Sequence, residues 1–174
     1  ALSMRSLAEE QQSGTLLWLF SQPLKIADIV NGKFFSVWTI GILCLIPSLI
    51  YFYTVYTLGV PAGNIDMGMT MGSYFGLIVL IGGFSALGIL ASSFSSNQIM
   101  AYLIGVLLCF VMYFGIEQLA SYKLLGSADF ILQNLGFYQH FTSFTRGLID
   151  TRDLFYFVLV ILICLKTAEF SVLK

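Results

Sequence analysis

Charged side chains are scarce in this sequence, and their scarcity excludes most classes of soluble protein. Only 10% of the 174 residues are charged, whereas 58% are hydrophobic. A soluble domain contains about 25% charged and about 45–50% apolar residues. The stretches 34–65 and 67–116 contain no charge at all, and a charge at the centre of a membrane helix costs about 2.5–3.5 kcal/mol. The composition therefore predicts an integral membrane protein.

Residues that build catalytic and metal sites are also rare. The chain has a single histidine and three cysteines, and Cys44, Cys109 and Cys164 lie far apart without a CxxC pair, so neither a zinc site nor a disulfide framework is predicted. No P-loop, G-x-S-x-G or H-E-x-x-H motif is present. The net charge of −1 supplies no basic face for nucleic acid. We therefore expect no catalytic, metal or cofactor site in this chain and no nucleic-acid partner.

A membrane-spanning helix needs roughly 20 residues. Four apolar stretches of the chain have about this length, when flanking residues are included where necessary. They predict an all-α integral membrane protein, with a single transmembrane domain over residues 1–174 and spans at 34–58, 71–91, 99–117 and 152–172. The first contains Pro47, which a membrane helix tolerates when its neighbours satisfy the freed carbonyl group. Five Lys and Arg residues flank the spans on the side of the chain ends and three on the other side, which favours cytoplasmic termini.

Residues 1–33 form a string of short amphipathic segments before the first span. A helix through Glu9 and Glu10 is expected to end at Gly14, because glycine suits a left-handed helix end, and Thr15 can cap a following helix. A further short helix is expected between Pro23 and Gly32. Such a string is typical of backbone on the membrane surface that presents a polar side to the cytoplasm. A simple lead-in to the first span is the alternative.

Residues 118–151 form a long connection in which we expect short interfacial helices. His140 lies on the polar side of one of them; a surface or packing role is favoured over a proton or metal site. Glu117, at the end of the third span, is interpreted as a helix-end residue that faces water rather than as a proton relay. Asp150 and Asp153 lie beside basic residues in solvated flanks and are interpreted as salt-bridged surface charges.

Gly68, Gly72 and Gly76 are spaced four residues apart at the start of the second span. Small residues at this spacing allow another helix to approach the backbone closely. The pattern predicts a packed face without identifying what packs there.

The segment from Arg5 to Lys33, RSLAEEQQSGTLLWLFSQPLKIADIVNGK, resembles the cytoplasmic segment of ABC-2-type transporter permeases. The family pattern runs roughly R-x-x-A-E-E-x-x-x-G-T, with a later proline and a terminal G-K; Leu17 departs from it, because the family usually has an acidic residue there. The segment HFTSFTRGLIDTRDLFYF is similar to the family's last extracellular loop and final span. Particular segments, YFYTVYTLGVPAGNIDMG, ASSFSSNQI and RGLIDTRD, are similar to the gliding-motility-associated permease of the Bacteroidetes.

The resemblance implies a six-span permease of the bacterial inner membrane, of which an N-terminally truncated chain beginning at Ala1 holds the last four spans. It implies a second permease, identical or paralogous, and two cytoplasmic ATPase subunits that carry ATP and Mg²⁺. The short helices before the first span would include the coupling helix that contacts the ATPase. The residues assigned to ATPase coupling are Glu9, Glu10, Gly14, Thr15, Pro23, Lys25 and Asp28. Those assigned to an extracytoplasmic gate loop are Phe144, Arg146, Gly147, Asp150, Arg152 and Asp153.

Two other functions remain open from the sequence. One is a non-transporting membrane anchor for a motility or ATPase complex. The other is an ATP-independent channel, which the small number of polar residues in the spans disfavours. If the protein is a transporter, the small number of polar residues in its spans favours an apolar, lipid-linked or polymeric substrate.

Overall fold

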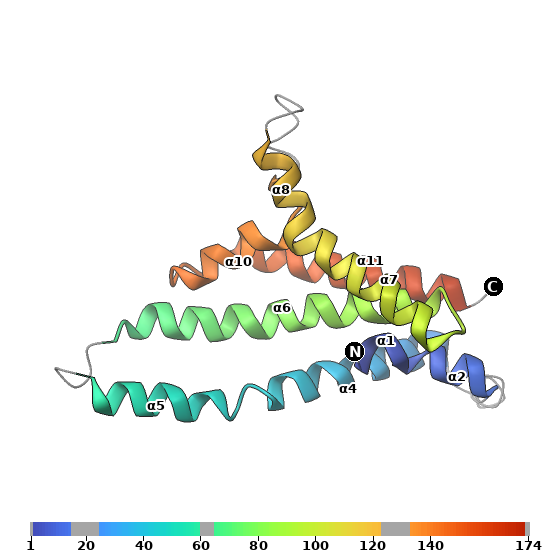
Figure 1. The fold of residues 1–174 in the computed structure, drawn as a ribbon, viewed down its shortest axis with the longest axis horizontal. Coiled ribbons are helices and arrows are strands. Elements are labelled where there is room, and N and C mark those ends of the chain that lie inside the picture. The colour runs from blue at the N-terminus through green and yellow to red at the C-terminus, as the bar shows by residue number, and fades with distance from the viewer. Residues whose placement is uncertain (1, 15–24, 60–64, 123–132, 173–174) are drawn as a thin grey trace.

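The computed structural model describes residues 2–14, 25–59, 65–122 and 133–172, and every regular element in those ranges is helical (Figure 1). Thr15, the helix expected to follow it and Pro23 lie outside the described residues, as do residues 123–132 of the long connection. The described elements are α1 (Leu2–Ser6), α2 (Ala8–Ser13), α4 (Ile26–Leu43), α5 (Ser48–Leu58), α6 (Met67–Ser93), α7 (Gln98–Phe110), the π-helix η1 (Val111–Gly115), α8 (Ile116–Ser121), α10 (Phe137–Thr145) and α11 (Thr151–Val172).

Four helical segments are long and apolar enough to cross a membrane, which confirms the predicted all-α membrane fold. They are Ile26–Leu58, Met67–Ser93, Gln98–Ser121 and Thr151–Val172. The first begins at Ile26, well before residue 34. The expectation that a separate short helix ends at Gly32 is wrong, because α4 continues through this residue. A glycine inside a helix costs only about 1 kcal/mol relative to alanine, which the long apolar run that follows offsets.

Helix α6 is the central element of the bundle. It contacts α1, α4, α7, α10 and α11, and Figure 1 shows it between α4–α5 on one side and α10–α11 on the other. In its most apolar window 61% of the residues are buried, compared with 6% in Ile26–Leu58. The glycines of α6 explain this central position, because helices in membranes pack most closely where side chains are small.

The first and third spans are both interrupted. Turns at residues 44–47 separate α4 from α5, directly at Pro47, as expected for a residue that cannot donate to the helix ladder. α5 has no buried residue. In the third span η1 separates α7 from α8, and π-helical turns of this kind change the direction of a helix. Figure 1 shows α8 diverging from α6 beyond this point.

Helix α10 fills part of the space between α6, η1 and α11, all of which it contacts. Its Phe137 and Phe144 side chains are completely buried. A Cβ atom on Gly83 would lie 3.0 Å from the ring of Phe137, and one on Gly76 would lie 2.6 Å from the Cβ of Phe144. Helix α10 therefore packs along the glycine face of α6 rather than lying on the surface of the bundle.

Candidate functional site

Helix α1 is inserted between α6 and α7. A Cβ atom on Gly88 of α6 would lie 2.8 Å from the Cβ of Ser3, and one on Gly105 of α7 would lie 2.6 Å from the Cγ of Met4. Ser3 and Met4 are both buried. Only glycine at these two positions leaves room for α1, so the beginning of the chain is packed into the transmembrane bundle.

The start of α2 is held by a hydroxyl group at the end of α6. Ser92 is completely buried, and its Oγ accepts hydrogen bonds from the backbone N–H of Leu7 at 2.9 Å and of Ala8 at 2.7 Å. The first N–H groups of a helix lack partners within the helix. Ser92 supplies that partner from a position 85 residues away in the sequence, and thereby ties α2 to α6.

Replacement of Ser92 by alanine is expected to destabilise this junction. Each buried N–H left without an acceptor costs about 1–3 kcal/mol. We expect a lower thermal unfolding temperature in detergent and faster amide exchange at Leu7 and Ala8. Ser93→Ala is the control, because the Ser93 hydroxyl donates only to the Leu90 carbonyl of its own helix. Equal stability of the two variants would contradict the role given to Ser92.

A salt bridge joins α2 to α4. The Nζ of Lys33 lies 2.6 Å from the Oε1 of Glu10, and Lys33 also donates to the backbone carbonyl of Ser6. The second carboxylate oxygen of Glu10 is buried and has no hydrogen-bond partner among the described residues. The charge of Glu10 is therefore balanced mainly by Lys33.

Glu9 makes a separate, exposed ion pair within the α1–α2 region. Arg5 donates to both of its carboxylate oxygens, at 2.8 and 2.6 Å. These hydrogen bonds lower the pKa of Glu9 and raise the pKa of Arg5. The stabilisation from Glu9 is therefore present above the ordinary carboxyl pKa and is lost as the pH falls through the lowered value. Because both groups are solvated, its effect on stability is small.

The remaining residues predicted for coupling lie at the same end of the bundle, where the structure describes them. Gly14 ends α2 with a φ of 72°, the left-handed conformation that the sequence predicted. Lys25 precedes α4 and Asp28 lies in its first turn, and both are exposed. An acidic residue there is favourable beside the positive end of the helix dipole. Thr15 and Pro23 lie outside the described residues.

The predicted glycine stripe contacts α10 and the turn that follows it. A Cβ atom on Gly72 would lie 2.5 Å from the backbone oxygen of Phe144 and 2.9 Å from the Cα of Gly147. Gly147 has a φ of 75°, and a Cβ there would lie 3.1 Å from the backbone carbon of Gly68. The stripe of Gly68, Gly72 and Gly76 thus receives a segment of the same chain through backbone contacts.

A contact between His140 and Asp153 joins α10 to α11. The Nδ1 of His140 lies 2.6 Å from the Oδ1 of Asp153, and its Nε2 lies 2.9 Å from the backbone oxygen of Asn134. The imidazole ring stacks on Tyr156 with a centroid distance of 3.9 Å. Asp153 has a pairing partner, as expected of a salt-bridged charge, but its expected surface position is wrong, because its side chain is only 12% exposed. The pairing depends on the meeting of two helices, which sequence spacing alone did not reveal.

Of the other residues assigned to the gate loop, some are packed against neighbouring elements and some are exposed. Phe144 is buried, and the Oδ1 of Asp150 accepts a hydrogen bond from the backbone N–H of Arg152 at 2.9 Å, at the start of α11. Arg146 and Arg152 are exposed. Neither arginine forms a salt bridge within the part of the chain that the structure describes.

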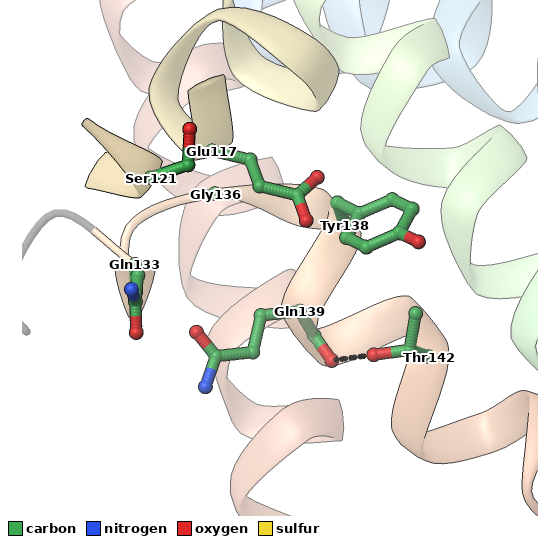
Figure 2. Close-up of a pocket in the computed structure, with 7 residues that line it drawn as sticks. All are labelled: Glu117, Ser121, Gln133, Gly136, Tyr138, Gln139 and Thr142. Atoms are coloured by element: carbon green, nitrogen blue, oxygen red, sulfur yellow. Dashed lines mark hydrogen bonds between the residues drawn. The ribbon is translucent and has the colours of Figure 1, made fainter. Parts of the chain in front are cut away.

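A cavity of about 310 Å³ lies between α8 and α10. Figure 2 shows the Glu117 side chain of α8 directed toward Tyr138 of α10. The described lining residues are Glu117, Ser121, Gln133, Gly136, Tyr138, Gln139 and Thr142. A cavity lined mainly by polar side chains is unexpected in a chain whose spans are so apolar.

Residues 1–166 match a family model described as ABC-2 family transporter protein. No curated protein and no solved structure matches the chain. The family match covers almost the whole sequence, from α1 to the last turns of α11.

Proposed function

The chain belongs to the ABC-2 family of transporter proteins, and from this premise we propose that it couples ATP hydrolysis by separate cytoplasmic subunits to the export of a substrate. A protein of this family is the membrane permease component of an ATP-binding cassette transporter and is not itself catalytic. The α2 end of the bundle, formed by α1, α2 and the first turns of α4, is proposed as the surface that contacts the ATPase.

The observation that carries this proposal is the way α2 is joined to the spans. Ser92 ties its first residues to α6, Lys33 ties Glu10 to α4, and α1 is wedged against α7 at Gly105. A force on α2 therefore reaches three membrane-spanning segments through hydrogen bonds, an ion pair and close packing. Transport driven by ATP requires a contact that differs between two ATPase states and is passed into the spans.

The exposed charges of the α2 end supply the polar side for such a partner. Glu9, Lys25 and Asp28 are at least partly exposed, whereas Glu10 is occupied by Lys33. The proposal places this end, together with the chain termini, in the cytoplasm of a bacterial cell and the opposite end outside the inner membrane. A second permease, identical or paralogous, completes the proposed complex within the membrane lipids.

A link to gliding motility is the most specific part of the proposal. It is supported by the similarity of the segments YFYTVYTLGVPAGNIDMG and RGLIDTRD to the gliding-motility-associated permease. Deletion of the gene in a gliding bacterium that carries it is expected to abolish surface movement, and the intact gene to restore it. Normal movement of the deletion strain would leave the transporter assignment in place and remove the motility link.

Reversing two charges at the α2 end is expected to separate the permease from its ATPase. In the Glu9→Lys, Asp28→Lys variant the proposed contact surface loses two negative charges and gains two positive ones. Like-charge contacts across an interface cost several kcal/mol, so we expect the co-purified ATPase to fall at least tenfold in mild detergent, with export lost in parallel.

The matched control reverses one exposed charge at the other end of the bundle. Arg146→Glu is expected to leave co-purification of the ATPase unchanged, because Arg146 lies beyond α10 on the far side of the bundle from α2. Unchanged co-purification by the double variant would refute the proposed contact surface. Absence of any ATPase from the unaltered protein would favour the non-transporting anchor or the ATP-independent channel.

A further inference from the structure

The cavity between α8 and α10 contains a carboxylate for which the described residues supply no counter-ion. The Glu117 side chain forms neither a salt bridge nor a hydrogen bond with another residue that the structure describes. The described lining contains no lysine, arginine or histidine. With Glu117 ionised, the described lining carries one negative charge and no positive charge.

The π-helical turn explains how Glu117 comes to face this cavity. η1 ends at Gly115, and Ile116 of α8 is buried while the next residue, Glu117, is only partly exposed. The change of helix direction moves α8 away from α6, and α10 occupies the space between them (Figure 1). Single π-helical turns inside α-helices occur frequently at functional sites.

The hydroxyl groups of the cavity present acceptors rather than donors. Ser121 donates its hydroxyl hydrogen to the backbone oxygen of Gln118 at 2.7 Å. Thr142 donates to the backbone oxygen of Gln139, also at 2.7 Å (Figure 2). Each hydroxyl oxygen therefore has only lone pairs left for a ligand, as has an ionised carboxylate. The exposed carboxamides of Gln133 and Gln139 each carry a carbonyl acceptor beside NH2 donors, and can turn the carbonyl group toward a cationic ligand.

This combination of charge and hydrogen-bonding capacity selects for a particular chemical group. A primary ammonium group carries one positive charge and three donors and has no acceptor. A carboxylate or phosphate ligand would meet the charge of Glu117 unfavourably. The aromatic ring of Tyr138, toward which Glu117 points in Figure 2, can add a cation–π contact.

We propose that this cavity binds a primary ammonium group, with Glu117 as its counter-ion and Ser121, Thr142 and the two glutamines as hydrogen-bond acceptors. Its volume, about 310 Å³, is at the lower end of the range for small-molecule sites. The ammonium group belongs either to a lipid head group, since the cavity lies at the end of a membrane span, or to a free amine in solution. The inference does not depend on ATP coupling.

The test measures binding of radiolabelled ethanolamine to the purified protein, with any co-purifying subunits, in phosphatidylglycerol nanodiscs. The buffer is amine-free phosphate with sodium chloride at physiological strength, so that a site for simple inorganic cations is already occupied. We expect saturable binding that falls at least tenfold in affinity in the Glu117→Gln variant, because a hydrogen bond to a charged group is worth about 1.5–3 kcal/mol. Choline, which has no N–H donors, is expected to bind at least tenfold more weakly than ethanolamine.

Two further variants make the result independent of general damage to the fold. Thr142→Val removes one acceptor while keeping the shape of the side chain, and is expected to lower ethanolamine affinity less than Glu117→Gln does. Glu169→Gln alters a carboxylate that pairs with Lys166 on α11, and is expected to leave binding unchanged.

The lipid of the nanodisc distinguishes the two sources of the ammonium group. Phosphatidylethanolamine that competes with ethanolamine identifies a lipid head group as the ligand, whereas binding that this lipid does not affect identifies a free amine. The proposal is overturned if ethanolamine does not bind saturably, if Glu117→Gln binds it as tightly as the unaltered protein, or if choline binds equally well.

Discussion

Replacement of Gly72 by alanine is expected to displace α10 from the transmembrane bundle. The new Cβ atom would lie 2.5 Å from the backbone oxygen of Phe144 and 2.9 Å from the Cα of Gly147. Both are backbone atoms, so no side-chain rotation relieves the overlap. Overpacking of this kind typically costs about 1–3 kcal/mol. We expect amide exchange along α10 to become at least about fivefold faster as the helix opens more often, with export reduced if α10 gates the exit.

The matched control is Gly32→Ala on α4. A Cβ atom on Gly32 has no neighbour within 4 Å, and alanine is favoured over glycine inside a helix by about 1 kcal/mol. This variant is expected to be as stable as the unaltered protein or slightly more stable. If the amides of α10 exchange as slowly in Gly72→Ala as in Gly32→Ala, the close approach of α10 to α6 at Gly72 is not needed to hold α10 in place.

Replacement of Asp153 by alanine is expected to destabilise the α10–α11 contact by about 3 kcal/mol. Both nitrogens of His140 face acceptors, Nδ1 the carboxylate of Asp153 and Nε2 the carbonyl of Asn134. The ring therefore makes both hydrogen bonds only when Nε2 carries a proton and a second proton lies between Nδ1 and Asp153. Without the carboxylate, a largely buried imidazole, 14% exposed, has no partner at Nδ1. Thermal unfolding in detergent can be followed through the reactivity of Cys164, which is buried on α11, after replacement of Cys44 and Cys109 by serine.

A neighbouring aspartate provides the comparison. Among the described residues the side chain of Asp150 accepts only the backbone N–H of Arg152, so Asp150→Ala removes a helix cap worth about 1 kcal/mol. In a double-mutant cycle, His140→Ala combined with Asp153→Ala is expected to cost clearly less than the sum of the two single changes. Additive costs, or equal losses for Asp150→Ala and Asp153→Ala, would show that the contact between His140 and Asp153 does not hold α10 against α11.

The transmembrane architecture was predictable because it depends on composition along the chain. Long charge-free stretches identify spans without knowledge of how they pack. The left-handed end of α2 at Gly14 was also a local property, since glycine adopts a positive φ without steric cost. The same reasoning was wrong at Gly32, which lies within regular helix and accepts a hydrogen bond from Ser36 at its carbonyl group. A glycine permits a helix to end but does not require it.

The site was less predictable than the spans. The glycines at 68, 72 and 76 indicated a packed face, and the structure identifies the segment around Phe144 and Gly147 as its occupant. Glu117 was interpreted as a helix-end residue facing water, and the structure places it, partly exposed, at the wall of a cavity whose other side is α10. Ser92 had no feature in the sequence to distinguish it from the other serines of the chain.

By itself, the sequence determined that this is a helical membrane protein with four spans, and its motifs indicated an ABC-2 permease. Only the tertiary structure decided which polar groups meet: Ser92 with the start of α2, Lys33 with Glu10, and His140 with Asp153. The positions of the spans depend on the free energy of transferring each segment into the bilayer. That free energy is a sum of contributions from residues that are neighbours in the sequence. Polar pairings follow from the direction and depth at which separate helices pack, and these are fixed only when the whole bundle has formed.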